Sequence, residues 1–318
     1  MMPARPIRIL FIVLILVISM MSEAHSQIGN VSKQTLIDIT KEWQGERFVD
    51  GRPKVSDDIL ERMQKVAIEE AWSVLRKHGY EYQFDGELTN VHPERILVGR
   101  AVTATFVPTR PDIKNYITEW GESTNRVGKG ASNSWVIDSL VENDVMVIDM
   151  FGKVIEGTFT GGNLANATKS NGANGMVIYG GVRDIDDTYD LDDFNFFILG
   201  YDPSGWRRSA DLVTMNGPTR IGRVTVIPGD VVLGRRGGLI FIPAHLAEEV
   251  VKTSEVTRLR DDFGYERMAQ GKYTPGQIDM KWTEEIMNDF LVWINDYLNE
   301  VYSSKAEIKR YLETGRWE

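Results

Sequence analysis

Two short stretches of this chain place an anion-binding turn, a cation and carboxylates at a spacing that suits a reactive site. Residues 161–165 read Gly-Gly-Asn-Leu-Ala, and residues 180–187 read Gly-Gly-Val-Arg-Asp-Ile-Asp-Asp. Backbone N–H groups that are free at the start of a helix attract carboxylates and phosphates. Such an anion cradle, next to a guanidinium and a carboxylate, is sufficient for a metal-assisted site. The residues concerned are Gly161, Gly162, Asn163, Leu164, Arg183 and Asp184.

The elements around these stretches determine where the side chains would lie. The glycine turn predicts a helix over residues 164–171. Residues 175–179 (GMVIY) are apolar and partly β-branched, which predicts a buried strand that ends at two glycines. Arg183 and Asp184 then emerge at the C-terminal end of that strand. Since ligands of open α/β sheets bind at such strand ends, we expect the site there.

The rest of the chain supplies a sheet and covering helices. Residues 144–149 predict a strand before the cradle helix, so strand, helix and strand form a βαβ unit. Asp144 and Asp149 are interpreted as structural residues at the ends of that strand. Ser56 predicts the start of a helix whose apolar positions run from Ile59 to Leu75. A second helix is predicted over 244–262, and further strands over 96–107, 195–199, 224–227, 231–233 and 239–242. The predicted fold class is α/β.

The C-terminal part carries an aromatic stripe at helical spacing. Its members are Trp282, Ile286, Phe290, Trp293 and Tyr297. A stripe of this kind packs against a core or a neighbouring subunit more often than it binds a ligand, so we expect it to be buried. Residues 27–50 are polar and predict an exposed lead-in.

The N-terminus has the three zones of a secretory signal peptide. Basic residues precede the apolar run 9–21, which leads to Ala24-His25-Ser26. An uncleaved anchor is the alternative, but this run is short for a membrane span of roughly 20 residues. We therefore expect residues 1–26 to be removed and the mature protein to be exported, either periplasmic or secreted, without a membrane attachment.

Composition narrows the classes of function. The formal net charge is −10, and this acidity argues against a nucleic-acid-binding surface. The chain has no cysteine, which excludes thiol nucleophiles, thiolate zinc sites and disulfides. His78, His92 and His245 are not at metal-ligand spacing from one another. Any metal should therefore be a hard ion on oxygen ligands, Mg²⁺ or Mn²⁺ before zinc.

The pattern over residues 161–187 resembles the RraA-like family. This family includes the regulators of RNase E activity, proteins labelled dimethylmenaquinone methyltransferase, and the class II 4-hydroxy-4-methyl-2-oxoglutarate/4-carboxy-4-hydroxy-2-oxoadipate aldolases. Residues 99–103 (GRAVT), 169–175 and 224–230, and the strand that ends at Pro243, agree with it as well. The resemblance covers roughly residues 55–255 and implies the family's swivelling β/β/α domain with N- and C-terminal helical extensions. It also implies a homotrimer or hexamer.

The resemblance implies roles for the site residues. Asp184 would bind Mg²⁺ or Mn²⁺ largely through waters, and Asp187 would support that hydration shell. Arg183 would hold the carboxylate and 2-oxo oxygen of a pyruvate-like group, with the backbone amides of residues 161–164 completing the cradle. The aldolases usually have an acidic residue where Gly162 stands here, associated with the water that handles protons, so this position departs from their pattern.

Two functions follow as expectations. The first is a divalent-metal-dependent lyase that cleaves a small 2-oxo acid through a pyruvate enolate, by aldol cleavage or by decarboxylation of oxaloacetate. The second is a non-catalytic module that binds a carboxylate or another protein. We divide the chain into a signal peptide (1–26), an N-terminal helical lead-in (27–95), an α/β core (96–262) and a C-terminal aromatic helical extension (263–318).

Overall fold

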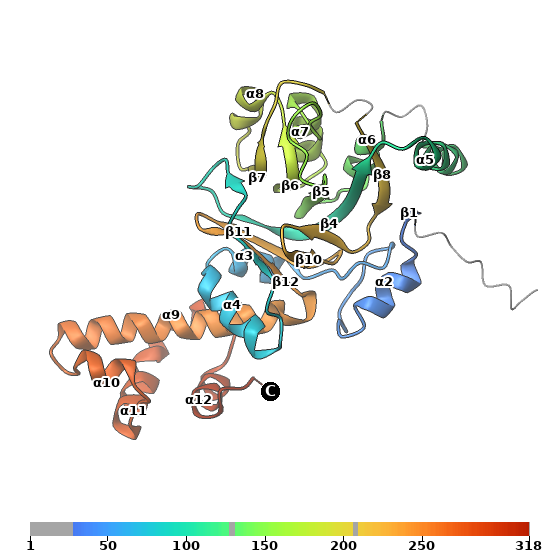
Figure 1. The fold of residues 1–318 in the computed structure, drawn as a ribbon. Helices are drawn as coiled ribbons and strands as arrows, with labels where there is room; N and C mark the ends of the chain where they lie inside the picture. Colours follow the sequence, from blue (N-terminus) through green and yellow to red (C-terminus); the bar gives the residue numbers. More distant parts are fainter. Residues whose placement is uncertain (1–27, 127–130, 206–208, 318) are drawn as a thin grey trace, which may run out of the picture.

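The protein is built around a ten-stranded mixed sheet in a computed structural model that describes residues 28–126, 131–205 and 209–317 (Figure 1). The predicted signal peptide lies outside the described residues. Along the sheet the order is β2-β12-β11-β4-β5-β6-β7-β3, and β8 pairs with both β4 and β1. The strands are β1 (Gly29–Asn30), β2 (Phe84–Asp85), β3 (Thr89–Asn90), β4 (Leu97–Pro108), β5 (Asp144–Asp149), β6 (Gly175–Val182), β7 (Asn195–Tyr201), β8 (Ala210–Met215), β11 (Val231–Arg235) and β12 (Gly238–Ile242).

The centre of the sheet is parallel and its flanks are antiparallel. β4, β5, β6 and β7 run parallel, while β11, β12 and β2 continue the sheet antiparallel beyond β4. The parallel strands are buried on both faces, which is why they read as continuous apolar runs. α7 (Gly162–Ser170) connects β5 to its parallel neighbour β6, as the βαβ pattern predicts.

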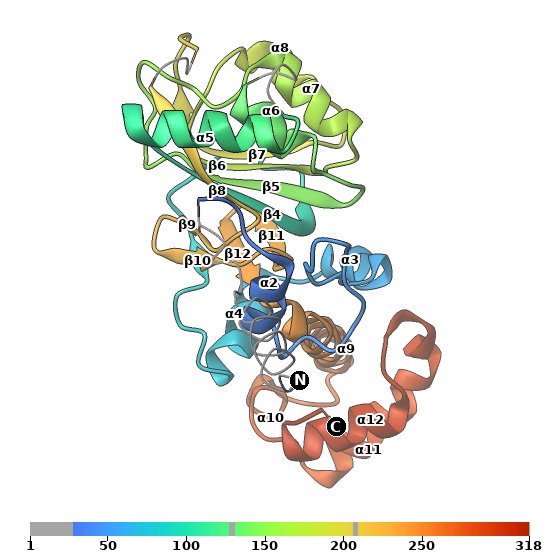
Figure 2. The ribbon, with the colours of Figure 1, turned by 90° about the vertical axis from the view of Figure 1, so that its right-hand side faces the viewer.

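Three apolar clusters hold the layers together. The first packs one face of the parallel strands under α5 (Pro111–Ser123), α6 (Ser132–Ile137), α7 and α8 (Ile185–Tyr189). The second joins β11 and β12 to α3 (Asp57–Met63), α4 (Ile68–Lys77) and α9 (Ala247–Ala269). The third lies between the other sheet face and the hairpin of β9 (Thr219–Ile221) and β10 (Val224–Val226). Figures 1 and 2 show α5–α8 at one end of the molecule and α3, α4 and α9 at the other. The α/β fold class is confirmed.

The helix predicted after Ser56 is two helices. Ser56 caps α3 as expected, because its hydroxyl accepts the N–H of Ile59 at 3.4 Å. The chain then leaves helical geometry, and Ala67 is extended before α4 begins. Glu70 stabilises this second start by accepting the N–H of Ala67 at 2.8 Å. The break lets α3 and α4 pack separately on α9.

The N-terminal lead-in over residues 28–50 is mostly exposed or half-buried, but it is also attached to the core. β1 pairs with β8, and α2 (Lys33–Ile39) buries Leu36 completely. The packing of this segment could not be predicted from the sequence. Its helix has seven residues and only one buried leucine, which gives little periodic signal among polar residues.

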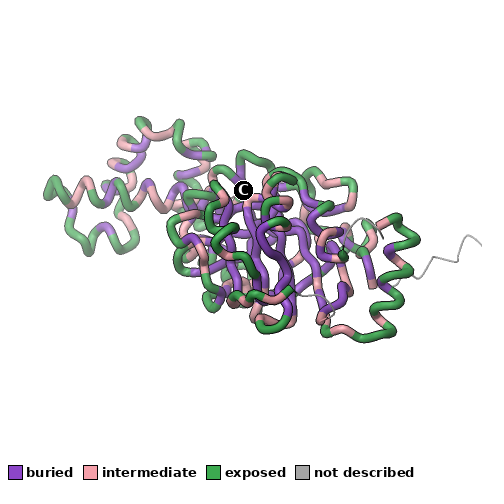
Figure 3. The backbone as a smooth tube through the Cα atoms, turned by 90° about the horizontal axis from the view of Figure 1, so that it is seen from above, coloured by how far each residue is buried: buried purple, intermediate pink, exposed green. Residues whose placement is uncertain are grey.

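The C-terminal stripe is buried only in part: Ile286 and Phe290 are buried, while Trp282, Trp293 and Tyr297 are half-buried. It packs against the far half of α9, where Phe263 lies 5.4 Å from the rings of both Trp282 and Phe290. α10 (Pro275–Asp279), α11 (Glu284–Trp293), the 3-10 helix η2 (Ile294–Glu300) and α12 (Lys305–Thr314) form a fourth apolar cluster with α9. Figure 3 shows the buried backbone concentrated in the sheet and more exposed backbone in this helical arm. No helix within the described residues is long and apolar enough to cross a membrane.

A buried ion pair joins the N-terminal segment to the central strands. The guanidinium of Arg52 donates to both carboxylate oxygens of Asp144, at 3.1 and 3.3 Å. Arg52 is 2% exposed, and Asp144 is completely buried at the first position of β5. Arg100 of β4 lies beside the pair, with its Nε 3.9 Å from the Asp144 carboxylate. A bidentate pair of this kind fixes both position and orientation.

Breaking this pair should destabilise the protein strongly. In Asp144→Asn the Arg52 guanidinium keeps its bond to Asp50 but loses its main buried partner. Removing one partner of a buried pair costs about 3–5 kcal/mol of unfolding free energy, which urea denaturation measures. The double variant Arg52→Met/Asp144→Leu should recover most of that loss, because it leaves no buried charge unpaired. A loss below about 1 kcal/mol in the single variant would show that the pair is not structural.

Candidate functional site

The end of β6 delivers Arg183 and Asp184 to the start of α7. β6 continues three residues beyond the predicted end and stops at Val182. The N–H of Arg183 then donates to the carbonyl of Thr160 at 2.9 Å, which joins this strand end to the loop before α7. Asp184 adopts a left-handed conformation (φ 54°, ψ 46°) and precedes α8. This conformation is uncommon outside glycine and best tolerated by Asp and Asn, and it is a feature of turns and functional sites.

The Asp184 carboxylate lies at the positive end of α7. Its Oδ2 accepts the N–H of Gly162, the first residue of the helix, at 3.2 Å. α7 begins two residues earlier than predicted, with Gly161 as the extended residue before it. The N–H groups of Asn163 and Leu164 also belong to the first turn, where a helix offers them no internal acceptor. The first turn of α7 therefore presents backbone donors, and one of them already holds a carboxylate.

Gly161 is required by the closeness of this contact. A Cβ at position 161 would lie 2.3 Å from Oδ2 of Asp184 and 2.9 Å from Cγ of Arg183. No real Cβ is found so close to another heavy atom. The glycine is thus needed for space and not for an unusual φ, since its φ of −138° is open to any residue.

Arg183 and Asp184 form a loose pair that is open to solvent. Nη1 of Arg183 lies 3.6 Å from Oδ2 of Asp184, and the two side chains are 44% and 37% exposed. An exposed pair at this distance contributes little to stability. The guanidinium consequently keeps most of its five donors for an anion that approaches the start of α7.

Asp187 stands on the other side of Gly162. A Cβ at position 162 would lie 3.1 Å from both Cβ and Oδ2 of Asp187. The Asp187 side chain thus lies in contact distance of the place where a side chain at residue 162 would begin. The two carboxylates, Asp184 and Asp187, flank the first residue of the helix.

The other residues that the sequence analysis singled out lie outside the group formed by Arg183, Asp184 and Asp187, or make no side-chain contact with it. Asn163 is exposed, while Leu164 is half-buried and packs on the first apolar cluster. Asp149 ends β5 with its side chain on the sheet face opposite α7, and it accepts the N–H of Phe151 at 2.7 Å. Burial raises the pKa of the Asp149 carboxyl. Asp144 lies at the other end of β5 in the ion pair with Arg52.

The donor set suits a hard ion that keeps most of its water. Among the described residues, no group of three or more His, Cys, Asp or Glu side chains could hold a metal by itself. Two neighbouring carboxylates, of which one is anchored by a backbone N–H, match the few protein ligands that Mg²⁺ needs. A zinc site would need a closed set of nitrogen or sulfur ligands. The residues present therefore fit Mg²⁺ or Mn²⁺.

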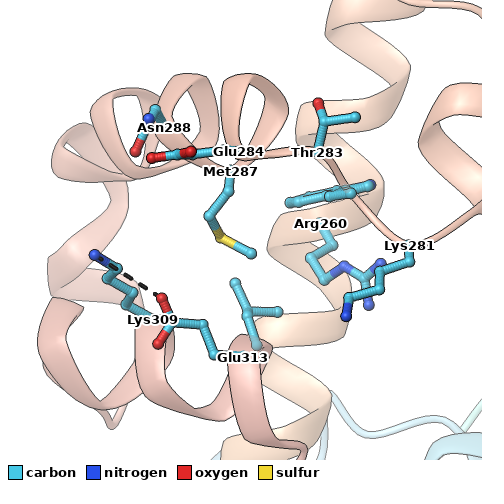
Figure 4. A pocket seen from close by; sticks show the side chains of 10 residues that line it. Arg260, Lys281, Thr283, Glu284, Met287, Asn288, Lys309 and Glu313 are labelled. Atoms are coloured by element: carbon cyan, nitrogen blue, oxygen red, sulfur yellow. Dashed lines mark ion pairs between the residues drawn. The ribbon is translucent and has the colours of Figure 1, made fainter.

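Another cavity lies in the helical arm, away from this site. It has a volume of about 460 Å³ and opens between α9, α11 and α12, with Met287 directed into it (Figure 4). The Arg260 guanidinium lies over the Trp282 ring at 4.6 Å. Both ribbon views place this arm at the opposite end of the molecule from α7 and α8. The cavity is therefore separate from the cradle.

The contact between Gly161 and Asp184 can be tested by one methyl group. In Gly161→Ala the new Cβ should push the Asp184 carboxylate away from the N–H of Gly162. In the wild type, the hydrogen bond to Asp184 should protect the Gly162 amide from hydrogen exchange, and NMR should show faster exchange of this amide in the variant. Gly276→Ala is the control, because nothing lies within 4 Å of its Cβ. Protection of the Gly162 amide that survives in Gly161→Ala would contradict the geometry.

Comparison with known proteins places these features in a family. The family model described as RraA-like, Aldolase/RraA, matches residues 53–241, which is more than half of the chain. Protein DlpA of Legionella pneumophila is 28% identical over 126 residues, which is 40% of this chain and 20% of that protein. The matched stretch thus spans about a fifth of that relative's length.

Solved structures agree in fold. An uncharacterised protein from Pseudomonas syringae pv. tomato superposes with a TM-score of 0.56 at 21% identity, covering 72% of this chain and 100% of that one. RraAS2 of Streptomyces coelicolor is described as an unusual member of the RNase ES inhibitor RraA protein family. It superposes with a TM-score of 0.55 at 21% identity, covering 69% of this chain and 98% of that one. At this identity the likeness shows the fold alone. On the strength of the family match, the chain belongs to the RraA-like family, which includes both aldolases and non-catalytic ribonuclease inhibitors.

Proposed function

We propose that this protein is a divalent-metal-dependent lyase that cleaves a small 2-oxo acid. The observation that carries the proposal is the meeting of Arg183, Asp184 and Asp187 at the first turn of α7. One guanidinium, free backbone donors and two carboxylates in one place suit a substrate that is an anion and becomes more negative during the reaction. The substrate class is 4-hydroxy-2-oxo acids of the 4-hydroxy-4-methyl-2-oxoglutarate type, or oxaloacetate.

The chain's own residues would bind and orient the substrate. Arg183 would grip the carboxylate and the 2-oxo oxygen through parallel N–H donors, which a lysine could not do. The first-turn amides of α7 would face the same carboxylate. Asp184, held in place by Gly162, would fix the hydration shell of Mg²⁺ or Mn²⁺. The ion would supply positive charge to the oxygen on which the enolate develops.

The reaction needs a group that moves a proton. In aldol cleavage the 4-hydroxyl loses its proton and becomes a carbonyl, and the C3–C4 bond breaks with its electron pair left on C3. The resulting pyruvate enolate then takes a proton at C3. Aldolases of the family usually carry an acidic residue at the position of Gly162, and here the Asp187 carboxylate lies next to that position. We infer that Asp187 handles this proton, directly or through a water.

A non-catalytic role is the alternative within the same family. The cradle would then bind a carboxylate without turnover, or the surface around it would bind another protein. The solvent exposure of Arg183 and Asp184 is compatible with this role too. Release of pyruvate separates the two, because a binding module releases none.

The assembly and the location are also proposals. We propose a homotrimer or hexamer of an exported protein, periplasmic or secreted, that acts on a small acid and not on nucleic acid. The acidic net charge of −10 supports the last point. Light scattering and fractionation of the expressing cells would test the subunit count and the location.

The first test is release of pyruvate from 4-hydroxy-2-oxo acids and from oxaloacetate, with Mg²⁺ and after chelation. The wild type should be active only with the metal, and Asp184→Ala should lose at least about a hundredfold in kcat/KM because it removes the group that anchors the ion. Calorimetric titration with Mg²⁺ should show the matching loss of affinity. Activity that chelation does not change, or equal Mg²⁺ affinity in both proteins, would refute the metal assignment.

The role of Asp187 can be tested with a substitution at this position and the same substitution at Asp186 as the control. Asp187→Asn should lower kcat by about a hundred- to ten-thousandfold with little change in KM, since a general acid or base contributes roughly 10²–10⁴ to the rate. Asp186→Asn removes the same charge at the adjacent exposed position and should stay within about twofold of wild type. Equal kcat values in the two variants would show that Asp187 does not move the proton.

A further inference from the structure

A second cavity lies beneath the N-terminal segment, far along the chain from the cradle. It has a volume of about 210 Å³ and is lined by the end of α2 and the residues after it, by residues that follow α4, by β10 and by the turn before α9. Its lining holds two carboxylates, two large aromatic rings, one imidazole and no lysine or arginine. The residues that carry the argument are Glu42, Trp43, Tyr80, Asp230 and His245.

Asp230 is the chemically unusual member of this set. It is 6% exposed, and its Oδ2 accepts the N–H of Ile227 at 2.9 Å. In the part of the chain that the structure describes, no lysine or arginine forms an ion pair with it. Burial raises the pKa of the Asp230 carboxyl to about 7. A buried carboxyl that lines a cavity without a cation is a site where a bound cation would gain most.

The other titratable groups share this electrostatic environment. Burial and the nearby charges of Asp230 and Glu42 raise the pKa of Tyr80. Burial lowers the pKa of His245, so its ring is neutral at pH 7 and supplies no competing charge. The rings of Tyr80 and His245 lie 6.0 Å apart and tilted by 55°, and they form one wall. Trp43 lines the cavity from the N-terminal segment.

The segment that carries Trp43 is held in place before any ligand arrives. The Arg47 guanidinium donates to the carbonyls of Thr40 and Trp43 at 2.8 and 3.0 Å, and to that of Gly51 at 2.9 Å. These bonds fix the loop from residue 40 to residue 51. A preformed wall lowers the entropy cost of binding.

We propose that this cavity binds the ammonium group of a small organic cation, with Asp230 as the counter-charge and Trp43 and Tyr80 as aromatic walls. Aromatic faces attract cations through their quadrupole, most strongly where water is excluded, and quaternary ammonium groups are recognised in this way. The volume is below the roughly 300–1,000 Å³ of drug-sized sites, which limits the occupant to a head group of the size of trimethylammonium.

The cavity in Figure 4 is a useful comparison, because the charges that line it differ from those that line the cavity at Asp230. That cavity mixes Arg260, Lys281 and Lys309 with Glu284 and Glu313, so its lining favours neither sign of charge. In the cavity at Asp230 the carboxylates are not mixed with lysine or arginine, and they share the lining with aromatic rings. Opposite charge and ring faces at one place are the two features that an organic cation requires.

The test is calorimetric titration of the full chain with choline, and with 3,3-dimethylbutan-1-ol as its uncharged isostere, without Mg²⁺ or an oxo acid. Choline should bind and the alcohol should not. Affinity for choline should be about tenfold higher at pH 8 than at pH 6, because the cation binds the ionised form of a carboxyl that titrates near 7. Equal binding of the two probes, or of choline at both pH values, would overturn the proposal.

Variants separate the site from the fold and from the cradle. Asp230→Asn keeps an oxygen that can accept the N–H of Ile227, and it should lose at least about tenfold in choline affinity. Trp43→Leu should lose a similar factor with Asp230 intact, which covers the case in which Asp230→Asn does not fold. Glu46→Gln removes an exposed carboxylate from the same loop and should bind like the wild type. Asp184→Ala should also bind normally, so the result is independent of the proposed lyase activity. Unchanged affinity in Trp43→Leu, or in folded Asp230→Asn, would refute the assignment.

Discussion

The buried pair of Arg52 and Asp144 is the constraint on which the arrangement of layers depends. Asp144 begins β5, the strand between β4 and β6. A carboxylate fixed there therefore fixes the N-terminal end of a central parallel strand. Arg100 on β4 adds bonds to the carbonyls of Val55 and Glu142, both at 2.7 Å. Two guanidiniums thus tie the N-terminal segment to two neighbouring strands in a place that water does not reach. Because the first residues of these strands are fixed, the opposite ends of β5 and β6 have little freedom. Arg183 follows the opposite end of β6.

The candidate site depends on a different kind of constraint, the absence of side chains. Gly161 lets the Asp184 carboxylate approach the start of α7, and Gly162 leaves room for Asp187 beside it. Two adjacent glycines therefore allow two carboxylates to lie at the first turn of the helix. Because Asp184 is held by a backbone donor and Arg183 by the Thr160 carbonyl, the two functional side chains inherit their geometry from backbone contacts. Those contacts vary little with the identity of surrounding side chains, which makes the arrangement robust to changes elsewhere in the sequence.

The sequence predicted the parts of the structure that rest on local pattern. The limits of β5 agree with the prediction at both ends, and the place of Arg183 after β6 follows from an apolar run that ends in glycines. The break between α3 and α4 was not predictable from periodicity, because Val66 continues the apolar pattern and is buried in the break itself. Neither was the partner of Asp144, since Arg52 lies 92 positions away and resembles any surface arginine in sequence. The same holds for Asp230: a Pro-Gly-Asp turn predicts its conformation, but its burial and its aromatic neighbours come from three distant segments.

The region that matches the family model contains the whole candidate site at α7, whereas the cavity at Asp230 is also lined by residues outside that region. The match over residues 53–241 contains the cradle, Arg183 and both site carboxylates. The segment that carries Trp43 precedes it, and the helical arm follows it. Asp230 lies within the matched region, but the cavity that it lines is closed by Trp43 on one side and His245 on the other, and both lie outside. A core that retained only residues 53–241 would lack both of these residues from the lining of the cavity. The additions to the core therefore complete the lining around a residue that the core already contains, and a relative without the N-terminal segment should have the same turn but not the same pocket.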